Sequence, residues 1–389
     1  MDLKKITFLT GHNWKSNRLG GFHKFAQEAL DQGIEVVFFS FPRPYYSYFQ
    51  HQELYNKKSI KELQKGLVYH ENNSTLTNVT LSTLKLPNFF NKFFSDSLMN
   101  AFERFSFSSF KRFAKKWLCG TDVFVFESCD GMIFLKKLKK MFPDAKFVYR
   151  PSDPLMYDGC LSRYQKNETQ MILGADLNII VNQEGLDLYK RKIDGFEEKA
   201  KYTLLSNGVD IESYQKTYPK PALLNKPNTF LYVGAWEVEW NLLFKACESN
   251  KNFNYIVVCP NFPDESVLQK VKSFENLFYV PGIKPQEVPA WITNCTVVMV
   301  PYVTDFYKNR PLGITAKYYQ AMAAQKPIVA YCDTPKLSEA GISVTYTYED
   351  FIAECQKAIA VGKNSYTFDL KDRQWSKITA KFIELLQNL

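Results

Sequence analysis

The chain has 389 residues, of which 46% are hydrophobic and 23% charged, and its formal net charge is +9. This composition is typical of a globular protein, and the length predicts about two domains. No apolar run reaches about 18 residues, the length that a membrane span needs, and the first run, residues 6–10, is too short for a secretory signal. We therefore expect a cytoplasmic protein without a membrane-spanning helix.

The eight cysteines form neither a C-x-x-C pair nor a zinc-like spacing. Several lie in apolar runs, which favours reduced, buried thiols. The positive charge comes without a nucleic-acid-binding motif, so it predicts at most nonspecific, salt-dependent attraction to nucleic acids. We therefore expect no nucleic-acid partner.

The first half of the chain alternates short apolar runs with helical segments, as in a βα domain. Residues 4–10, 22–32 and 34–40 predict a strand, a helix and a second strand. Residues 42–86 are polar and aromatic, and we assign no element to them; they are a candidate for a variable acceptor-side region. The later strands predicted in this half are residues 122–127, 146–150 and 176–181, with a lysine-rich helix that ends at Met141.

The loop after the first strand, residues 11–21, ends in two glycines. It lacks the G-x-G-x-x-G spacing of dinucleotide-binding proteins. Gly20 and Gly21 would instead allow another molecule to approach the backbone closely, so both are candidate binding residues. His12 and His23 flank the loop, and an ordinary surface position is the simplest interpretation, above all for His23.

Residues 88–118 combine many aromatic and basic side chains. Helical patterning with Lys or Arg beside Phe or Trp suits peripheral contact with an anionic membrane. The alternative, which we prefer unless the function itself requires a membrane, is that the aromatic side chains are core and the basic ones its solvated edge. The segment contains Phe89, Phe90, Phe93, Phe94, Phe102, Phe105, Phe110, Phe113 and Trp117, and Lys92, Arg104, Lys111, Arg112, Lys115 and Lys116.

The predicted strand 146–150 is followed directly by Pro151-Ser152-Asp153-Pro154. A carboxylate at the carboxyl end of a parallel strand is well placed to meet a ligand, and the prolines stiffen its backbone. Asp153 is therefore a candidate general base. The alternative is a turn or helix-capping aspartate, a common use of Ser-Asp-Pro.

Residues 216–227 hold three prolines and several lysines, which predicts a linker. A second series of βα elements follows the linker. It predicts strands at residues 229–233, 254–259, 277–280, 296–300 and 328–331, and helices around 289–292 and at 315–325, 351–361 and 375–386.

The strand 296–300, the loop 302–311 and the helix 315–325 form the most informative unit of this half. Lys317 falls in the first turn of the helix, and Gln320 shares its face. A helix N-terminus suits a diphosphate, to which Lys317 would add a charge and Gln320 a hydrogen bond. The alternative is an amphipathic helix whose Lys and Gln face solvent.

Two βα domains joined by a linker describe a cleft enzyme, and their order resembles the GT-B glycosyltransferases. In that α/β fold two Rossmann-like domains face each other across a central cleft, and the C-terminal one binds the nucleotide sugar. More narrowly, the chain resembles the xanthan-type (GumK-like) glucuronosyltransferases, glycosyltransferase family 70. The matching pieces are YRPSD at 149–153, SNGVD at 206–210, LYVGAWEVE at 231–239, PY at 301–302 and AKYYQ at 316–320, and the resemblance covers most of the chain except roughly 42–118.

The resemblance implies a role for each matching residue. Asp153 would be the catalytic base. Lys317 would hold the donor diphosphate, with Tyr302 and Gln320 beside it. Trp236 would make an apolar contact with the nucleotide, Glu239 would be the acidic residue of that site, and Asp210 would lie on the hinge side.

The resemblance also implies how the reaction runs. The E-x7-E pattern of retaining GT-B enzymes is absent, which favours inversion, and there is no D-x-D triplet, so we expect no metal and no cofactor besides the UDP-sugar donor. For a uronate donor, Lys308 or Arg310 could meet the carboxylate. The expected domains are residues 1–214 for the acceptor and 228–370 for the nucleotide sugar, with a helix in 371–389 that could cross back to the first domain.

The implied function is an inverting, metal-independent transfer of a sugar, with glucuronic acid as a candidate, from a UDP-sugar to a lipid-linked or polysaccharide-precursor acceptor. Such an enzyme of capsule or exopolysaccharide biosynthesis would contact the anionic inner face of the cell membrane. Two alternatives stay open: a nucleotide-sugar epimerase of the same fold, and a non-catalytic nucleotide-sugar-binding protein.

Overall fold

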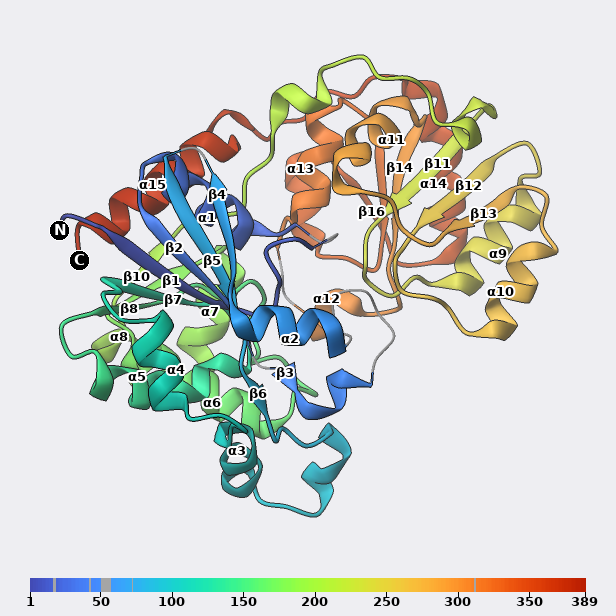
Figure 1. Ribbon diagram of the computed structural model, residues 1–389. Helices are drawn as coiled ribbons and strands as arrows, with labels where there is room; N and C mark the ends of the chain where they lie inside the picture. Colours follow the sequence, from blue (N-terminus) through green and yellow to red (C-terminus); the bar gives the residue numbers. More distant parts are fainter. Residues whose placement is uncertain (17–18, 42, 50–56, 72, 311–312) are drawn as a thin grey trace. The chain divides into compact units, whose positions relative to one another are not determined.

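The computed structural model describes residues 1–16, 19–41, 43–49, 57–71, 73–310 and 313–389. The chain divides into two compact units (Figure 1). Unit 1 comprises Met1–Ser206 and Ile378–Leu389, and unit 2 comprises Asn207–Lys377. The boundary lies at Ser206–Asn207, and the expected linker 216–227 lies within unit 2, where Leu224 is buried.

Unit 1 is built on an eight-stranded sheet of order β10-β9-β8-β7-β1-β2-β5-β4. Every neighbouring pair is parallel except the antiparallel pair β4 and β5. The chain leaves β1 toward β2 on one side and later returns to β7 on the other, so the exit loops of β1 and β7 diverge. The strands are β1 (Lys5–Thr10), β2 (Glu35–Ser40), β4 (Leu67–Glu71), β5 (Ser74–Val79), β7 (Val123–Phe126), β8 (Lys146–Tyr149), β9 (Leu177–Ile180) and β10 (Tyr202–Leu204).

Both faces of this sheet are covered by helices, which explains why its central strands β1, β2, β7 and β8 are apolar runs rather than alternating ones. Because successive strand residues point to opposite faces, Phe8 and Phe38 meet α1, whereas Leu9 and Phe39 belong to the core on the other face. The helices are α1 (Gly21–Asp31), α2 (Lys57–Lys65), α3 (Asp96–Arg104), α4 (Phe110–Trp117), α5 (Leu135–Met141), α6 (Ser162–Gly174), α7 (Gln183–Lys192) and α8 (Phe196–Lys199).

The C-terminal helix α15 (Trp375–Gln387) packs on unit 1 beside β1 and α1, and the two chain termini lie close together (Figure 1). The Phe382 ring stacks on Phe25 at 4.1 Å and lies 6.3 Å from Phe8. The Thr379 hydroxyl donates a hydrogen bond of 2.7 Å to Glu28. These contacts make α15 part of the apolar core of unit 1.

The segment 43–83, to which the sequence assigned no element, contributes two strands to the main sheet. It holds β4 and β5, the helix α2, the 3₁₀ helix η1 (Tyr45–Tyr48) and the short pair β3 (Arg43–Pro44) and β6 (Ser82–Thr83). After it come η3 (Asn88–Lys92), α3 and α4, while η4 (Asp130–Phe134) follows β7.

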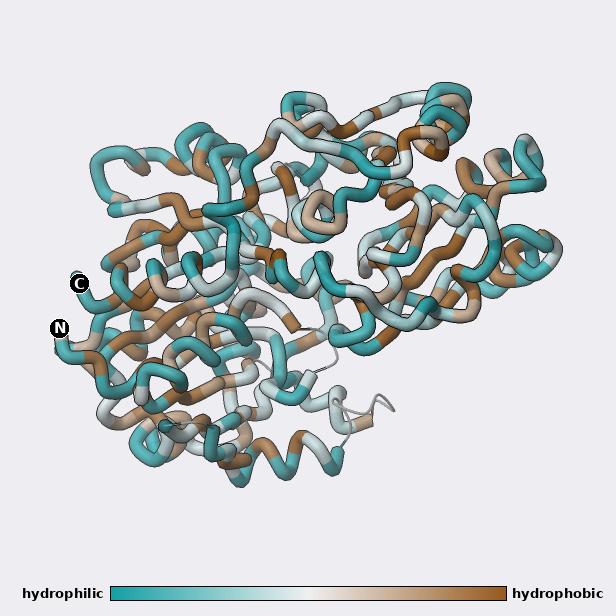
Figure 2. Tube along the Cα trace, turned by 90° about the horizontal axis from the view of Figure 1, so that it is seen from above, coloured by the Kyte–Doolittle hydropathy of each residue, from teal (hydrophilic) through white to brown (hydrophobic). Residues whose placement is uncertain are grey.

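Unit 2 carries a fully parallel sheet of order β13-β12-β11-β14-β15-β16. In each unit the hydrophobic residues follow the strands (Figure 2). The strands are β11 (Thr229–Val233), β12 (Asn254–Val258), β13 (Leu277–Val280), β14 (Val297–Pro301), β15 (Ile328–Tyr331) and β16 (Ser343–Thr345). The helices are α9 (Trp240–Ser249), α10 (Glu265–Lys272), α11 (Val288–Asn294), α12 (Phe306–Asn309), α13 (Ala316–Ala323) and α14 (Tyr348–Val361), with 3₁₀ turns η5 (Ile211–Tyr214), η6 (Ala222–Asn225), η7 (Pro285–Glu287), η8 (Pro335–Ala340) and η9 (Lys371–Arg373).

Three predicted strands, 229–233, 277–280 and 328–331, coincide with β11, β13 and β15. The predicted helix 315–325 is shorter, because Gln325 adopts a left-handed backbone conformation (φ 54°) that ends it. The predicted loop 302–311 contains α12, and its last residue, Pro311, lies outside the described residues, as do residues 17–18 of the loop 11–21. In the part of the chain that is described, no helix is long and apolar enough to cross a membrane.

Candidate functional site

In unit 2 the exit loops of β11 and β14 diverge, because the chain passes from β11 to β12 on one side and reaches β14 on the other. In open parallel sheets, such a switch point at the carboxyl ends of the strands is where ligands bind. The β11 exit loop runs along the end of β14: Val238 bridges to Tyr302, and the Glu239 amide donates to the Pro301 carbonyl at 2.9 Å.

Lys317, Tyr302 and Trp236, three of the residues predicted to bind the donor, come together here. The Lys317 Nζ donates a hydrogen bond to the Tyr302 hydroxyl and lies 4.4 Å from the centre of that ring and 5.0 Å from the Tyr232 ring. Tyr302 stacks on Phe306 at 4.1 Å, and Phe306 meets the Trp236 ring edge-on at 5.5 Å. A cation therefore lies beside a row of aromatic rings, of which Tyr302 and Phe306 are buried and Trp236 is partly exposed.

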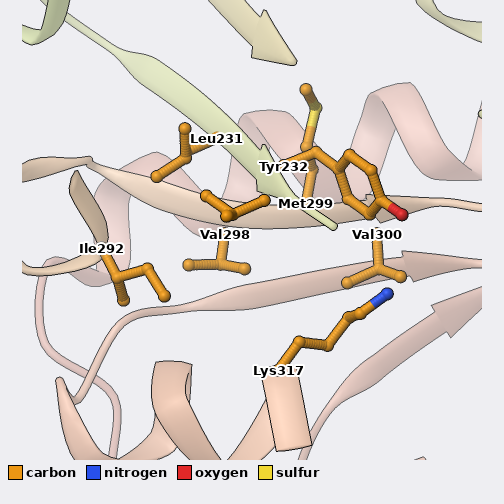
Figure 3. Close-up of a pocket in the computed structure, with 8 residues that line it drawn as sticks. Leu231, Tyr232, Ile292, Val298, Met299, Val300 and Lys317 are labelled. Atoms are coloured by element: carbon orange, nitrogen blue, oxygen red, sulfur yellow. The ribbon is translucent and has the colours of Figure 1, made fainter. Parts of the chain in front are cut away.

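Gly234, in the β11 exit loop, is required by this packing. A Cβ atom there would lie 2.6 Å from the Tyr232 hydroxyl and 3.2 Å from the Lys317 Nζ. Lys317 and Tyr232 also line a small cavity whose other walls are apolar, with the Nζ and the Tyr232 hydroxyl at the same end (Figure 3). Burial in these surroundings lowers the pKa of Lys317 to about 7, although the Asp333 carboxylate acts to raise it.

The first turn of α13 offers backbone donors next to Lys317. Thr315 is its N-cap residue, yet its side chain makes no capping hydrogen bond. Among the described residues, the Thr315 hydroxyl oxygen is buried without a hydrogen-bond partner. A helix start that its own side chains leave uncapped suits a phosphate oxygen.

Other predicted residues of unit 2 lie outside the Lys317–Trp236 cluster. Gln320 is half-buried one turn along α13 from Lys317. Glu239 precedes α9, and its carboxylate interacts with Tyr348, whose pKa is raised by burial first and by Glu239 second. Asp210 accepts a hydrogen bond of 2.6 Å from the Ser213 hydroxyl and caps η5. The contacts of Asp210 thus give it a local structural role.

In unit 1, Asp153 lies half-buried just after β8, and the exit of β7 holds its backbone. The Ser128 hydroxyl accepts hydrogen bonds from the amides of Ser152 (3.2 Å) and Asp153 (3.3 Å). The Ser152 hydroxyl donates to Glu127 Oε1 at 2.6 Å. Glu127 and Ser128, which our sequence analysis missed, therefore belong to the same site.

Glu127 is buried and also reaches the exit of β1. Its Oε2 accepts from the Thr10 hydroxyl and from the Gly11 amide (3.2 Å), and its Oε1 lies 3.6 Å from His12 Nε2. Burial acts to raise the pKa of Glu127, but the bonds to His12, Ser152 and Thr10 outweigh it and lower the pKa to about 2. The position of Glu127 directly after an apolar strand was the signal that could have identified it.

His23 is buried, so the expectation of a surface position is wrong. Its Nδ1 accepts from the Gly20 amide at 3.2 Å, and its Nε2 lies 2.9 Å from the Asn13 carbonyl. The ring packs between Trp14 and Phe38 because it projects from the inner face of α1. Burial lowers the pKa of His23 to about 4, so it is neutral at pH 7.

Gly20 and Gly21 start α1: Gly20 is its N-cap, with an extended backbone, and Gly21 its first residue. A Cβ on Gly20 would lie 3.9 Å from His12 Nε2, an ordinary contact. Among the described residues, no neighbour therefore demands glycine at position 20. In the described part of the chain, no three His, Cys, Asp or Glu side chains are grouped as metal ligands would be.

Residues 8–181 match the sequence model of a family described as glucuronosyltransferase GumK, N-terminal domain. No curated protein matches the chain. Similar solved structures include a sucrose-phosphate synthase from Thermosynechococcus elongatus (14% identity, 99% of this chain and 98% of that chain covered, TM-score 0.66). Another is trehalose-6-phosphate from E. coli bound with UDP-2-fluoro glucose (14% identity, 99% of both chains covered, TM-score 0.64).

A third is a trehalose-6-phosphate synthase described for glycosyltransfer with retention (13% identity, 99% of both chains covered, TM-score 0.62). At such low identity these structures speak for the fold, and they confirm the predicted GT-B fold. Together with the match of residues 8–181, they agree with the predicted enzyme class, a glycosyltransferase.

Proposed function

We propose that the protein transfers a sugar from a UDP-sugar, with inversion and without a metal, to a lipid-linked or polysaccharide-precursor acceptor. The observation that carries the proposal is the cluster of Lys317, Tyr302 and Trp236 at the switch point of the unit 2 sheet. It combines a cation for a diphosphate with the partly exposed Trp236 ring for a nucleoside.

The diphosphate would bind at the start of α13. Lys317 supplies the charge there, and the uncapped first turn with the Thr315 hydroxyl supplies hydrogen-bond donors. A phosphate oxygen would take the place of Tyr302 as the partner of the Lys317 ammonium and would favour its charged form. As the bond to the sugar breaks, these groups would stabilise the charge that develops on the leaving UDP.

Glucuronic acid is the sugar we propose, because a second cation, Arg310, lies over the Trp236 ring. The Arg310 guanidinium carbon lies 4.5 Å from the centre of the Trp236 ring, so stacking orients its donors. Lys308, the other candidate, is exposed and paired with Asp305 at 2.7 Å. Arg310, whose guanidinium is held over the Trp236 ring, is our candidate partner for a uronate carboxylate.

Asp153 is our candidate for the base. In the proposed step an acceptor hydroxyl oxygen attacks the anomeric carbon, the bond from that carbon to the diphosphate oxygen breaks, and UDP leaves with the bonding electrons. The hydroxyl proton passes to the Asp153 carboxylate. A positioned carboxylate contributes about 10²–10⁴-fold to such a reaction even when its pKa lies below the working pH.

A lipid-linked acceptor requires access to a membrane surface, and unit 1 exposes aromatic side chains that suit one. Phe89, Phe93, Phe105 and Phe107 are 59%, 73%, 56% and 59% exposed. Their segment is anchored by two ion pairs, the buried pair of Arg163 with Glu103 and the partly buried pair of Lys85 with Asp130. We propose that these four phenylalanines, the exposed Phe patch, insert at the headgroup level.

The basic residues of α4 lie on a helix whose own phenylalanines are buried, unlike those of the exposed Phe patch. Phe110 and Phe113 are buried in the core, so this half of the 88–118 segment follows the alternative of core aromatics with a solvated edge. Lys111, Arg112, Lys115 and Lys116 point to solvent and can meet anionic headgroups without insertion.

A screen of UDP-sugars for stabilisation of the pure protein tests the donor, since a ligand that binds the native state raises the melting temperature by mass action. The donor found there is then incubated with lipid-linked acceptors, and NMR gives the anomeric configuration of the product. Inversion supports the proposal, whereas retention, as in the similar synthase, would replace it. Turnover of the UDP-sugar without any acceptor would favour an epimerase.

A further inference from the structure

The turn that carries Asp153 is fastened to the neighbouring strand exit rather than held by its own backbone alone. Pro151 and Pro154 lack N–H groups, so Ser152 and Asp153 supply the donors at its tip. Both amides donate to one acceptor, the Ser128 hydroxyl, at 3.2 and 3.3 Å. Because β7 and β8 are parallel neighbours that pair Phe126 with Tyr149, Ser128 and Ser152 leave the sheet at the same edge.

Glu127 adds a second attachment. Its Oε1 accepts from the Ser152 hydroxyl at 2.6 Å, and its Oε2 binds the Thr10 hydroxyl and the Gly11 amide at the end of β1. One buried carboxylate thus connects the exits of β1, β7 and β8. Such a charge is stable in the interior only because each of its oxygens accepts hydrogen bonds.

Two basic side chains, those of Arg150 and His12, lie near the Glu127 carboxylate. Arg150, buried at the end of β8, interacts with both Glu127 and Asp153, and His12 lies 3.6 Å from Glu127 Oε1. The pKa of Arg150 is lowered to about 10 by burial, so the guanidinium still carries its charge at neutral pH. Arg150 thus supplies positive charge next to both Glu127 and Asp153.

We propose that Glu127 and Ser128 are positioning residues that hold the Asp153 carboxylate where it can take the acceptor proton. The inference rests on the proposed function, in which Asp153 is the base. A reacting group must be held to within about 0.5 Å of its working position by side chains that are themselves fixed. Ser128 and Glu127, at the β7 exit, accept three hydrogen bonds from the turn and thereby fix the backbone that carries the Asp153 carboxylate.

The test compares single-atom changes. Ser128→Ala removes the shared acceptor, and Ser128→Thr keeps it. Ser109→Ala is the matched control, because the Ser109 hydroxyl also accepts a backbone amide at 3.3 Å, from Arg112 at the start of α4. The measurements are kcat, the KM for the UDP-sugar, the UDP affinity by calorimetry and the melting temperature.

We expect Ser128→Ala to lower kcat at least tenfold while the affinity for UDP stays within twofold of wild type. Ser128→Thr should restore most of kcat, and Ser109→Ala should leave it unchanged at a similar loss in melting temperature. Glu127→Gln, which keeps an acceptor for Ser152 but loses the charge, should lower kcat without changing the UDP affinity.

Two outcomes separate the inference from the function on which it rests. If Asp153→Asn is inactive while Ser128→Ala and Glu127→Gln turn over like wild type, the positioning role is wrong and the base stands. If Asp153→Asn is fully active, the proposed base is wrong, and with it the reason for positioning this turn. A kcat that falls equally in Ser128→Ala and Ser109→Ala would show a loss of stability alone, and would also overturn the inference.

Discussion

The ammonium of Lys317 donates to the hydroxyl of Tyr302 and lies 4.4 Å from the centre of the same ring. Tyr302 directly follows β14 and Lys317 lies in the first turn of α13. A buried lysine whose hydrogen-bond partner is a neutral phenol gains from an anion that replaces the phenol.

Lys317→Ala should weaken UDP binding by about 10- to 100-fold, since a charge-assisted hydrogen bond to phosphate contributes about 1.5–3 kcal/mol. Calorimetric titration with UDP measures the change. Lys308→Ala is the control: Lys308 is exposed on α12 and pairs with Asp305, and such a pair contributes little. Equal UDP affinity in wild type and Lys317→Ala would make Lys317 a structural residue.

UDP binding should also take up a proton. In the unliganded protein the pKa of Lys317 is about 7, so at pH 8 about nine-tenths of the lysine is neutral, and the diphosphate would bind the charged form. Titrations at pH 8 in buffers of different ionisation enthalpy should show uptake of close to one proton, and the affinity should fall as the pH rises above 7. In Lys317→Arg, which stays charged, the uptake should vanish; uptake that persists there would point to another group.

Stability should fall with pH between about 6.5 and 4 because of His23. Its pKa in the native protein is about 4 against 6.5 unfolded, since burial opposes its charge. In that window the unfolded chain binds more protons, so each pH unit of acidification removes up to about 1.4 kcal/mol. Urea unfolding of His23→Gln at pH 7, 5.5 and 4.5 should show a shallower pH dependence than wild type.

Glu127 also contributes to the pH dependence of the free energy of unfolding, but at lower pH than His23. Its native pKa is depressed to about 2, so its stabilisation is present above the unfolded value of 4.5 and is lost as the pH falls from there toward 2.

For His23, the contradicting outcome is a free energy of unfolding that depends on pH between 6.5 and 4.5 in His23→Gln as strongly as in wild type.

The exposed Phe patch and the α4 cations can be tested separately on membranes. Replacing Phe89, Phe93, Phe105 and Phe107 together by Ser should abolish sedimentation with vesicles that contain anionic lipid. Changing Lys111, Arg112, Lys115 and Lys116 together to Glu should weaken it in a salt-dependent way, since each basic residue near such a surface contributes about 1 kcal/mol. If wild-type protein does not sediment with anionic vesicles, the proposed membrane contact is wrong.

The sequence was informative wherever burial leaves a simple pattern. Strands covered on both faces are apolar runs, so β11, β13 and β15 were found to the residue. β5 was missed because its buried residue Asn78 is polar. The Asn78 side-chain amide donates hydrogen bonds to the Phe38 carbonyl and the Ser40 hydroxyl on β2, and these bonds offset the cost of its burial. Partners so distant in the sequence leave no local pattern.

The candidate site residues were only partly predictable, because some of their contacts join segments that are distant in the sequence. Lys317 and Tyr302 lie in one continuous unit, and their neighbourhood follows from local structure. The link from Glu127 to Thr10 and Ser152 depends on the strand order β8-β7-β1, which brings together exits that are distant in the chain. Strand order is set by how the helices cover the sheet, and a single sequence does not specify it.

The central claim is that Asp153 takes the acceptor proton while unit 2 holds the donor, and one variant tests both halves. Asp153→Asn keeps the shape of the side chain and the backbone bonds to Ser128. We expect turnover to fall at least about 100-fold while the affinity for the UDP-sugar, measured on the same preparation with EDTA present, stays unchanged. Turnover equal to wild type would contradict the account.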